Sequence, residues 1–291
     1  MYEGRVETKQ SAENEQRIHA ELSYRTALHH YRQKRGVDQQ CWVTWLIVGI
    51  TVIIWCITAT QAAIVGGFRD WRAVLYDIGN NAISVQNDQS LSQVLIAAGA
   101  KADNLIKQGE YWRFLTPIFL HANALHLLLN MVNLLVLGII LERIMGHLRF
   151  LFVYTITGIV SMIVSFVFAP DILSVGASGA IFGLVGAYSL FIVMHRRAFP
   201  RGGLFALLWL IVVIGINLGS GGIFPNVDNY AHIGGLISGC VLGAWFMPLY
   251  RTSSVADQTL VDVHSLTYRW PLAVLTILGT LLFAIIACFL I

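Results

Sequence analysis

Long apolar runs separated by polar stretches dominate the chain. A hydrocarbon core about 30 Å thick needs roughly 20 apolar residues in a helix, and seven segments approach or exceed that length. They lie near 42–65, 123–141, 150–169, 176–194, 203–219, 230–249 and 271–291. Because the runs are continuous rather than alternating, they favour membrane helices over the strands of a barrel. The pattern predicts an all-α membrane protein with seven transmembrane helices.

The polar stretches divide the chain into regions. Residues 1–41 form a polar N-terminal segment that lacks the pattern of a cleavable signal peptide. Residues 66–120 form a long first loop whose tryptophan and tyrosine residues are typical of a membrane interface. A second polar loop, 250–270, precedes the last predicted helix.

Basic residues indicate the orientation of these helices. If the predicted helices alternate in direction, fourteen of the nineteen Lys and Arg residues fall on one side, and the other five all fall in loop 66–120. Cytoplasmic loops carry an excess of Lys and Arg. We therefore expect residues 1–41 and loop 250–270 in the cytoplasm and the C-terminus outside. The fourth and sixth predicted helices then both begin on the external side.

Composition narrows the function classes. The chain is 56% hydrophobic and 12% charged, whereas soluble domains average about a quarter charged residues. A net charge of +3 is too small to indicate a nucleic-acid partner. The four cysteines show neither metal-ligand spacing nor a disulfide framework. We expect a multi-pass membrane protein that uses neither a metal nor a cofactor.

The fourth predicted helix begins with Gly176-Ala177-Ser178-Gly179. A helix N-terminus offers unpaired N–H groups and the positive end of the helix dipole, which would stabilise an oxyanion formed at Ser178. Gly176 and Gly179 allow a substrate backbone to approach closely. Taken alone, the motif is more often structural, because serine and glycine are common packing residues in membrane helices.

A histidine begins the sixth predicted helix, within Ala231-His232-Ile233-Gly234-Gly235. An imidazole in an otherwise apolar, glycine-rich helix is costly, which favours a function for His232, and its ordinary pKa of about 6.5 suits a general base. Both helices carry small residues at intervals of four: Gly179, Gly183 and Ala187 in the fourth, and Ala231, Gly235, Gly239 and Gly243 in the sixth. If these stripes face each other, Ser178 and His232 come within hydrogen-bond distance.

The second predicted helix carries further polar candidates. His126 and Asn130 are four residues apart and share one helix face, so both could donate to an oxyanion. Hydrogen bonding between helices and a metal site are the alternatives, although no carboxylate stands nearby and no HExxH sequence occurs. Asp228, one turn before His232, is a weak candidate to orient its ring. A two-residue Ser–His pair is the simpler hypothesis.

Several motifs, in this order, resemble those of the rhomboid family of intramembrane serine proteases. The residues that carry the resemblance are GxSG (Gly176, Ser178, Gly179), AHxxGxxxG (Ala231, His232, Gly235, Gly239), HxxxN (His126, Asn130) with His121 before it, Trp112-Arg113, and GxxxExxxG (Gly138, Glu142, Gly146). The match covers roughly residues 110–245.

The resemblance implies a six-helix rhomboid-like bundle over 42–249, with one additional C-terminal transmembrane helix at 271–291 and the fifth span as a substrate gate. It implies that Ser178 and His232 are the catalytic pair, in a water-filled recess open to the external side. The implied oxyanion hole consists of His126, Asn130 and the Ser178 N–H, and the implied supporting residues are Gly176, Gly179, Phe182 and His121. Substrates would be single-pass transmembrane proteins, cut within the lipid bilayer near the external end of a helix.

The sequence departs from the rhomboid pattern in two features, and two other functions are alternatives to a protease. Phe182 stands where many rhomboids have a tyrosine that packs on the histidine, but a phenyl ring can still stack. The seventh helix occurs in a subset of the family. A catalytically inactive relative that binds membrane proteins is the first alternative, although such relatives usually lack the serine or the histidine. A transporter or channel would show charges inside helices or paired repeats. The short polar parts favour a bacterial inner membrane, and the oligomeric state stays open.

Overall fold

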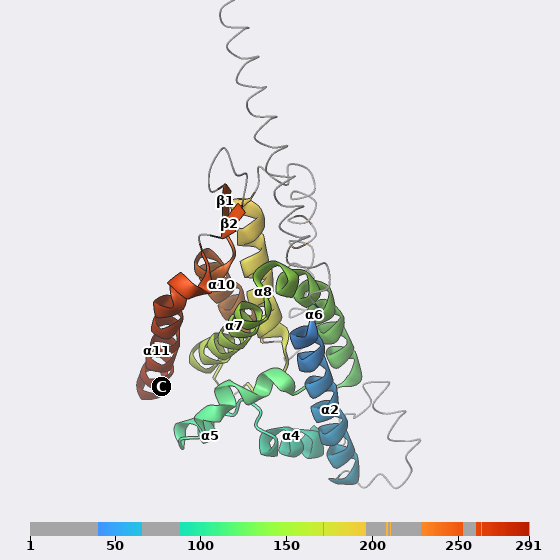
Figure 1. The fold of residues 1–291 in the computed structure, drawn as a ribbon. Helices are drawn as coiled ribbons and strands as arrows, with labels where there is room; N and C mark the ends of the chain where they lie inside the picture. Colours follow the sequence, from blue (N-terminus) through green and yellow to red (C-terminus); the bar gives the residue numbers. More distant parts are fainter. Residues whose placement is uncertain are drawn as a thin grey trace, which may run out of the picture.

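The computed structural model describes residues 40–65, 88–170, 172–195, 208, 210, 228–252, 260–262 and 264–290. Within these residues the chain forms a bundle of helices with one short β-ribbon (Figure 1). Its elements are α2 (Trp42–Val65), α4 (Asp88–Ala97), α5 (Asp103–Lys107), η1 (Tyr111–Phe114), η2 (Thr116–Phe119), α6 (Ala124–Met145), α7 (His147–Phe168), α8 (Ser178–Met194), α10 (Asn229–Phe246), β1 (Tyr250–Thr252), β2 (Leu260–Asp262) and α11 (Leu266–Leu290). The N-terminal segment before residue 40 and almost all of the fifth predicted span lie outside the described residues.

Six of the seven predicted apolar segments are helices in the structure. Four helices of the described chain are long and apolar enough to cross a membrane, namely Trp42–Val65, Ala124–Met145, His147–Phe168 and Thr267–Phe289. Helix α8 is apolar but has 17 residues, and the glycine-rich α10 has 18. The expectation of a helical membrane protein is confirmed, while the number of spans stays a prediction.

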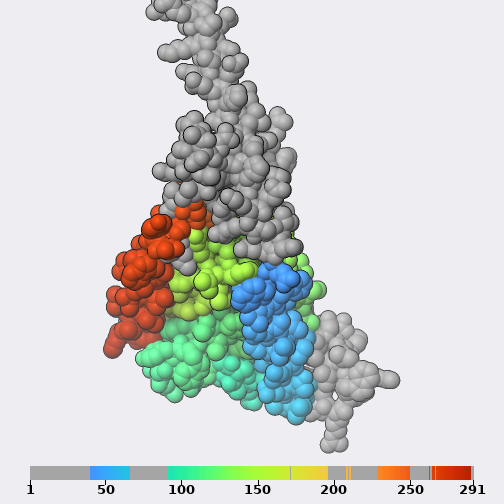
Figure 2. Space-filling view, viewed as in Figure 1, coloured from blue at the N-terminus to red at the C-terminus, as the bar shows by residue number. Residues whose placement is uncertain are grey.

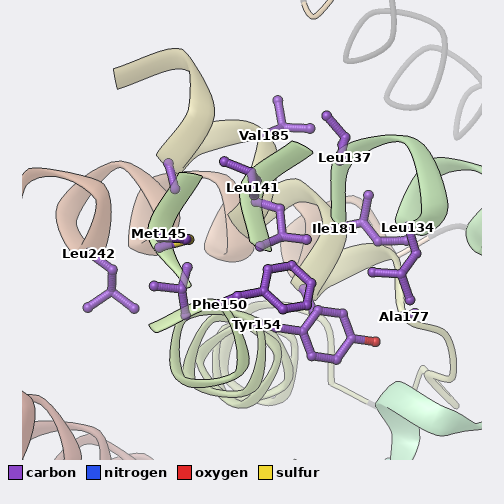
Figure 3. Close-up of a cluster of buried hydrophobic side chains, with 14 of the residues drawn as sticks. Leu134, Leu137, Leu141, Met145, Phe150, Tyr154, Ala177, Ile181, Val185 and Leu242 are labelled. Carbon is purple, nitrogen blue, oxygen red and sulfur yellow. The ribbon is translucent and has the colours of Figure 1, made fainter. Parts of the chain in front are cut away.

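Helix α8 lies at the centre of the bundle and packs against α6, α7 and α10 (Figure 1). Its side chains are apolar or small all round, which is typical of a helix that is buried on every face. Leu134 and Leu141 of α6, Phe150 of α7, and Ile181 and Val185 of α8 meet in the main core (Figure 3). The core therefore includes side chains of α8 and α10, the two helices that begin with Ser178 and Asn229.

Helices α2 and α11 are peripheral and lie on either side of the face drawn in Figure 2. Helix α2 packs on α6, and α11 packs mainly on α7. Only 6% of the apolar window of α11 is buried, so most of this helix is free to face lipid. The ribbon of β1 and β2 and the helices α4 and α5 lie at opposite ends of the bundle (Figure 1).

The boundary between the second and third helices differs from the approximate one that hydropathy predicts. Helix α6 continues to Met145, beyond the predicted end at 141, and α7 begins at His147 rather than 150. Gly146 alone separates them, with a φ of 83° that favours glycine. Glu142, which follows the predicted end at 141, is part of α6, and its side chain is buried inside the bundle.

The predicted loop 250–270 contains more structure than the all-α expectation allowed. Strand β1 pairs with β2 in antiparallel register, with Tyr250 opposite Asp262, and α11 begins at Leu266, before the predicted start at 271. Strands of three residues are too short to leave an alternating pattern in the sequence. The ribbon is anchored by a contact distant in sequence, because Arg149 Nη2 lies 2.7 Å from the carboxylate of Asp262.

Candidate active site

Ser178 and His232 lie within hydrogen-bond distance of each other, with 2.8 Å between Ser178 Oγ and His232 Nε2. Ser178 is the first residue of α8, and His232 lies in the first turn of α10. The side chain of His232 is buried. The hydroxyl therefore sits where the unpaired N–H groups of α8 begin.

The packing of α8 against α10 brings these two residues together. A Cβ added to Gly235 would collide with the carbonyl oxygen of Gly179, and one added to Gly239 would collide with that of Gly183. A Cβ on Gly243 would meet Ala187 Cα at 2.9 Å. The two small-residue stripes therefore face each other, which is the condition for contact between Ser178 and His232. Only glycine allows the helix axes to approach this closely.

Phe182 fixes the plane of the His232 ring. The two rings are stacked, with centroids 4.5 Å apart and an angle of 10° between their planes. Phe182 lies one turn after Ser178, so α8 supplies both the hydroxyl and the ring that supports its partner. The stacking expected for a phenyl ring at this position is present.

No carboxylate of the described residues accepts a hydrogen bond from His232 Nδ1. Asp228, the weak candidate for that role, is instead the N-cap of α10, and its side chain accepts a hydrogen bond from Ala231 N at 3.0 Å. Among the described residues, Ser178 and His232 therefore form a hydrogen-bonded pair with no third member. Within the described chain, no group of three or more His, Cys, Asp or Glu side chains could hold a metal ion.

His126 approaches Ser178 across Gly176. Gly176 has a φ of 128°, and a Cβ added there would lie 2.8 Å from His126 Nε2 and 3.7 Å from Ser178 Oγ. The missing Cβ thus leaves a small space between the His126 ring and the Ser178 hydroxyl. Both the backbone conformation and this space require glycine at position 176.

Asn130 of α6 and His121 of the segment before it lie next to His126. Asn130 is buried, and its Nδ2 donates to His126 O at 2.8 Å. His121 packs edge-on against His126, with ring centroids 5.0 Å apart, and its Nε2 faces Ala177 N at 3.5 Å. Burial, helped by the neighbouring His126, lowers the pKa of His121 to about 3, so its ring is neutral at pH 7.

Known proteins are similar in sequence to the part of the chain that carries Ser178 and His232. A family profile described as "Rhomboid domain" matches residues 108–249. The chain is 40% identical over 138 residues to "Putative rhomboid protease YdcA" of Bacillus subtilis (strain 168), which covers 47% of this chain and 68% of that protein. The chain belongs to the rhomboid family. With its apolar helices, this rhomboid is an integral, multi-pass membrane protein.

Two other relatives of this rhomboid are longer than the chain. "Rhomboid protease GluP" of Bacillus subtilis (strain 168) is 45% identical over 157 residues, which are 54% of this chain and 30% of that protein. "RHOMBOID-like protein 7" of Arabidopsis thaliana is 39% identical over 153 residues, which are 52% of this chain and 48% of that protein. The chain therefore spans less than half the length of these two relatives.

Two further motifs of this rhomboid tie elements together away from the Ser–His pair. Arg113 is buried, and its guanidinium donates to Glu110 Oε2 at 2.6 Å, to Ile96 O at 2.7 Å and to Ala100 O at 2.9 Å. Glu142 accepts from the N-terminus of α2, at 3.0 Å from Val43 N. Arg113 thus fixes η1 to the end of α4, and Glu142 fixes α2 to α6.

Sequence reasoning missed two serines close to the rhomboid site. Ser165 of α7 and Ser174 of the following loop both lie against the carboxylate of Asp228. The side chain of Ser165 is fully buried inside an apolar helix. A polar residue within an apolar helix is the sequence signal that could have identified it, because polar groups inside membrane helices are usually functional.

Proposed function

We propose that this rhomboid is an intramembrane serine endopeptidase in which Ser178 is the nucleophile and His232 the general base. The observation that carries the proposal is the 2.8 Å contact between Ser178 Oγ and His232 Nε2 at the N-terminus of α8. A serine is a weak nucleophile until a neighbouring base removes its proton. The stacked Phe182 ring supports the imidazole in the orientation that this proton transfer needs.

The proposed reaction proceeds in two stages. Ser178 Oγ attacks the carbonyl carbon of the scissile peptide bond while its proton moves to His232 Nε2. The tetrahedral intermediate then collapses, the C–N bond breaks, and His232 gives the proton to the departing amine. In the second stage His232 takes a proton from water, the resulting hydroxide attacks the acyl-enzyme ester, and Ser178 Oγ regains the proton as it leaves.

The oxyanion of this reaction would lie in the space that Gly176 leaves open. His126 lines one side of that space, and the Ser178 N–H belongs to the unpaired first turn of α8. Asn130 carries a second N–H on the amide that bonds His126 O. In this proposal the three groups donate to the developing negative charge, and such donors supply a large part of catalysis in acyl transfer.

The proposed substrates are single-pass transmembrane proteins that reach the site from the lipid bilayer. In this proposal the chain has a six-span core and a seventh span at α11, with the N-terminus in the cytoplasm and the C-terminus outside. Ser178 and His232 then lie toward the external leaflet of a bacterial inner membrane. The distribution of Lys and Arg supports this orientation.

A catalytically inactive rhomboid that only binds membrane proteins is the alternative. The presence of both Ser178 and His232, in contact with each other, favours the protease. The two functions differ in what a covalent probe finds, because only an activated serine reacts readily with a fluorophosphonate.

The test uses the full chain reconstituted in lipid vesicles with a single-pass transmembrane substrate. We expect the wild-type protein to cleave the substrate and to be labelled by a fluorophosphonate at Ser178. Ser178→Ala should abolish both, and His232→Ala should abolish cleavage while the thermal melting curve stays cooperative. Cleavage by Ser178→Ala at the wild-type rate would overturn the proposal, and binding without any cleavage or labelling would favour the inactive alternative.

A further inference from the structure

Three polar side chains beside the Ser–His pair form a connected cluster that the proposed reaction does not use. The carboxylate of Asp228 lies in hydrogen-bond contact with the hydroxyls of Ser165 and Ser174. The two hydroxyls lie 3.2 Å from each other. Ser165 comes from α7, Ser174 from the loop between α7 and α8, and Asp228 from the start of α10. The cluster therefore joins three of the segments that surround the site.

Two members of this cluster have the same position relative to the reacting groups. Ser174 precedes Ser178 by four residues, and Asp228 precedes His232 by four residues. A hydrogen bond between Ser174 and Asp228 thus connects the segment that leads into the nucleophile with the segment that leads into the base. A shift of either segment along its helix axis would stretch this bond and the 2.8 Å contact of Ser178 with His232 together.

Asp228 also fixes the first turn of α10. Its Oδ1 accepts from Ala231 N at 3.0 Å, and its backbone carbonyl accepts from His232 N at 3.3 Å. A carboxylate is a strong N-cap because it satisfies backbone N–H groups that have no partner inside the helix. One oxygen of Asp228 thus caps α10 while the other holds α7 and the segment before α8.

The segment before Ser178 is held from its other side by Lys101. Lys101 N donates to Ser174 O at 3.1 Å, so the two residues form an isolated antiparallel bridge. The buried ammonium of Lys101 lies 2.9 Å from Asp103 Oδ1 and donates to Ala169 O at 2.9 Å, at the end of α7. Ser174 is therefore fixed through its backbone, and its hydroxyl is directed to Asp228.

We propose that Asp228 is a positioning residue for catalysis, which sets the distance between Ser178 and His232 through its hydrogen bonds to Ser174 and Ser165. The inference rests on the proposed protease function. His232 Nδ1 has no carboxylate partner among the described residues, so the position of its ring depends on Phe182 and on the placement of α10. Reactions of this kind are sensitive to small displacements, and a shift of about 1 Å can cost on the order of 10²-fold in rate.

The test compares Asp228→Ala, Asp228→Asn, Ser174→Ala and Ser174→Thr with the wild type in lipid vesicles. For each we measure kcat and KM for a transmembrane substrate, the rate of fluorophosphonate labelling and the melting temperature. We expect Asp228→Ala to lower kcat and the labelling rate by on the order of 10²-fold with little change in KM. Asp228→Asn keeps an acceptor for Ala231 N and should retain more activity than Asp228→Ala. Ser174→Thr keeps the hydroxyl and should restore much of what Ser174→Ala loses.

The double variant Asp228→Ala/Ser174→Ala tests whether the two residues affect the rate through their shared hydrogen bond or independently of each other. If the hydrogen bond is what matters, the double variant should be no slower than Asp228→Ala alone. Ser174→Ala removes the same bond with the cap of α10 intact, so it also tests the proposal if Asp228→Ala folds poorly. Losses that multiply in the double variant would overturn the proposal.

A matched control distinguishes positioning from general destabilisation. Glu142→Gln disturbs a buried carboxylate where α2 meets α6 and leaves the cluster around Asp228 intact. At temperatures where all variants are fully folded, Glu142→Gln should label at the wild-type rate and Asp228→Ala should not. Equal labelling by both variants would overturn the positioning role alone, provided that Ser178→Ala is inactive. Wild-type cleavage by Ser178→Ala would overturn the protease and this inference together.

Discussion

The ring of Phe182 lies parallel to that of His232, with centroids 4.5 Å apart and 10° between the planes. Both residues lie on buried faces of their helices, one in α8 and the other in α10. Stacked aromatic rings attract each other beyond the area that they bury. Phe182 therefore limits rotation of the imidazole about its side-chain bonds while the edge that carries Nε2 stays directed at Ser178.

Replacing Phe182 tests how much of the activity depends on this stacking. Phe182→Ala leaves a cavity beside the imidazole, so we expect kcat to fall by about 10- to 100-fold through misplacement of the base. Phe182→Tyr preserves the aromatic face and should keep activity close to that of the wild type. Cleavage assays in vesicles check both variants. Equal activity of Phe182→Ala and the wild type would show that the ring fills space but does not orient the imidazole.

The glycines of α10 test the close contact between α8 and α10. A Cβ at Gly239 would collide with Gly183 O, so Gly239→Ala must push the helices apart and should cost about 1–3 kcal/mol of stability. The displacement should also lower the rate of cleavage, because the same contact sets the approach of His232 to Ser178. The melting temperature and the cleavage rate are the measurements.

Gly279 provides the matched control for this substitution. It also lies within a helix, but a Cβ added there meets nothing within 4 Å. Alanine has a higher helix propensity than glycine, so Gly279→Ala should leave the melting temperature unchanged or raise it slightly and leave cleavage unaffected. If Gly239→Ala behaves like Gly279→Ala, the close packing of α8 on α10 is not needed.

The helices and the facing stripes could be predicted because each depends on local periodicity. A continuous apolar run is enough to predict a membrane helix, and glycines repeated every four residues mark the faces of α8 and α10 that meet. The proximity of Ser178 to His232 then follows, since each residue lies in the first turn of its helix. No distant contact has to be known for this step.

The contacts that could not be predicted join residues far apart in sequence. The partners of Asp228 depend on how far α7 extends and on the path of the loop that carries Ser174, and neither has a periodic signature. The charge of Glu142 lowers the hydropathy just beyond residue 141, but four hydrogen-bonding groups around its carboxylate compensate its burial. The short ribbon of β1 and β2 depends in the same way on Asp262 and Arg149.

Glu142→Gln tests the attachment of α2 to the bundle. The carboxylate accepts from Val43 N at 3.0 Å, from Thr44 N at 2.8 Å and from Thr44 Oγ1 at 2.6 Å. An amide of the same shape places N–H groups against some of these donors, so we expect a loss of about 1–3 kcal/mol. Thermal unfolding in detergent measures this loss. Fluorophosphonate labelling below the transition should stay at the wild-type rate, and a large loss of labelling would mean that α2 influences the site.

His264 lies at the end of the bundle opposite α4 and α5, and it makes the stability of the chain depend on pH. Its side chain is buried, and its Nδ1 lies 3.0 Å from Met247 O. Burial, together with the nearby Arg269, lowers the pKa of His264 below its usual value. The folded protein therefore holds this imidazole neutral at a pH at which the unfolded chain protonates it.

This lowered pKa predicts a loss of stability on acidification. Below the ordinary histidine pKa of about 6.5, the unfolded chain binds more protons at this position than the folded chain, so the free energy of unfolding falls as the pH falls. His264→Asn keeps an N–H donor for Met247 O but does not titrate in this range. The melting temperature of the variant should therefore fall less than that of the wild type between pH 7.5 and pH 5.5. The other buried histidines contribute equally to both proteins. If the melting temperatures of the two proteins fall by the same amount over this pH range, His264 gains its proton as readily in the folded chain as in the unfolded one.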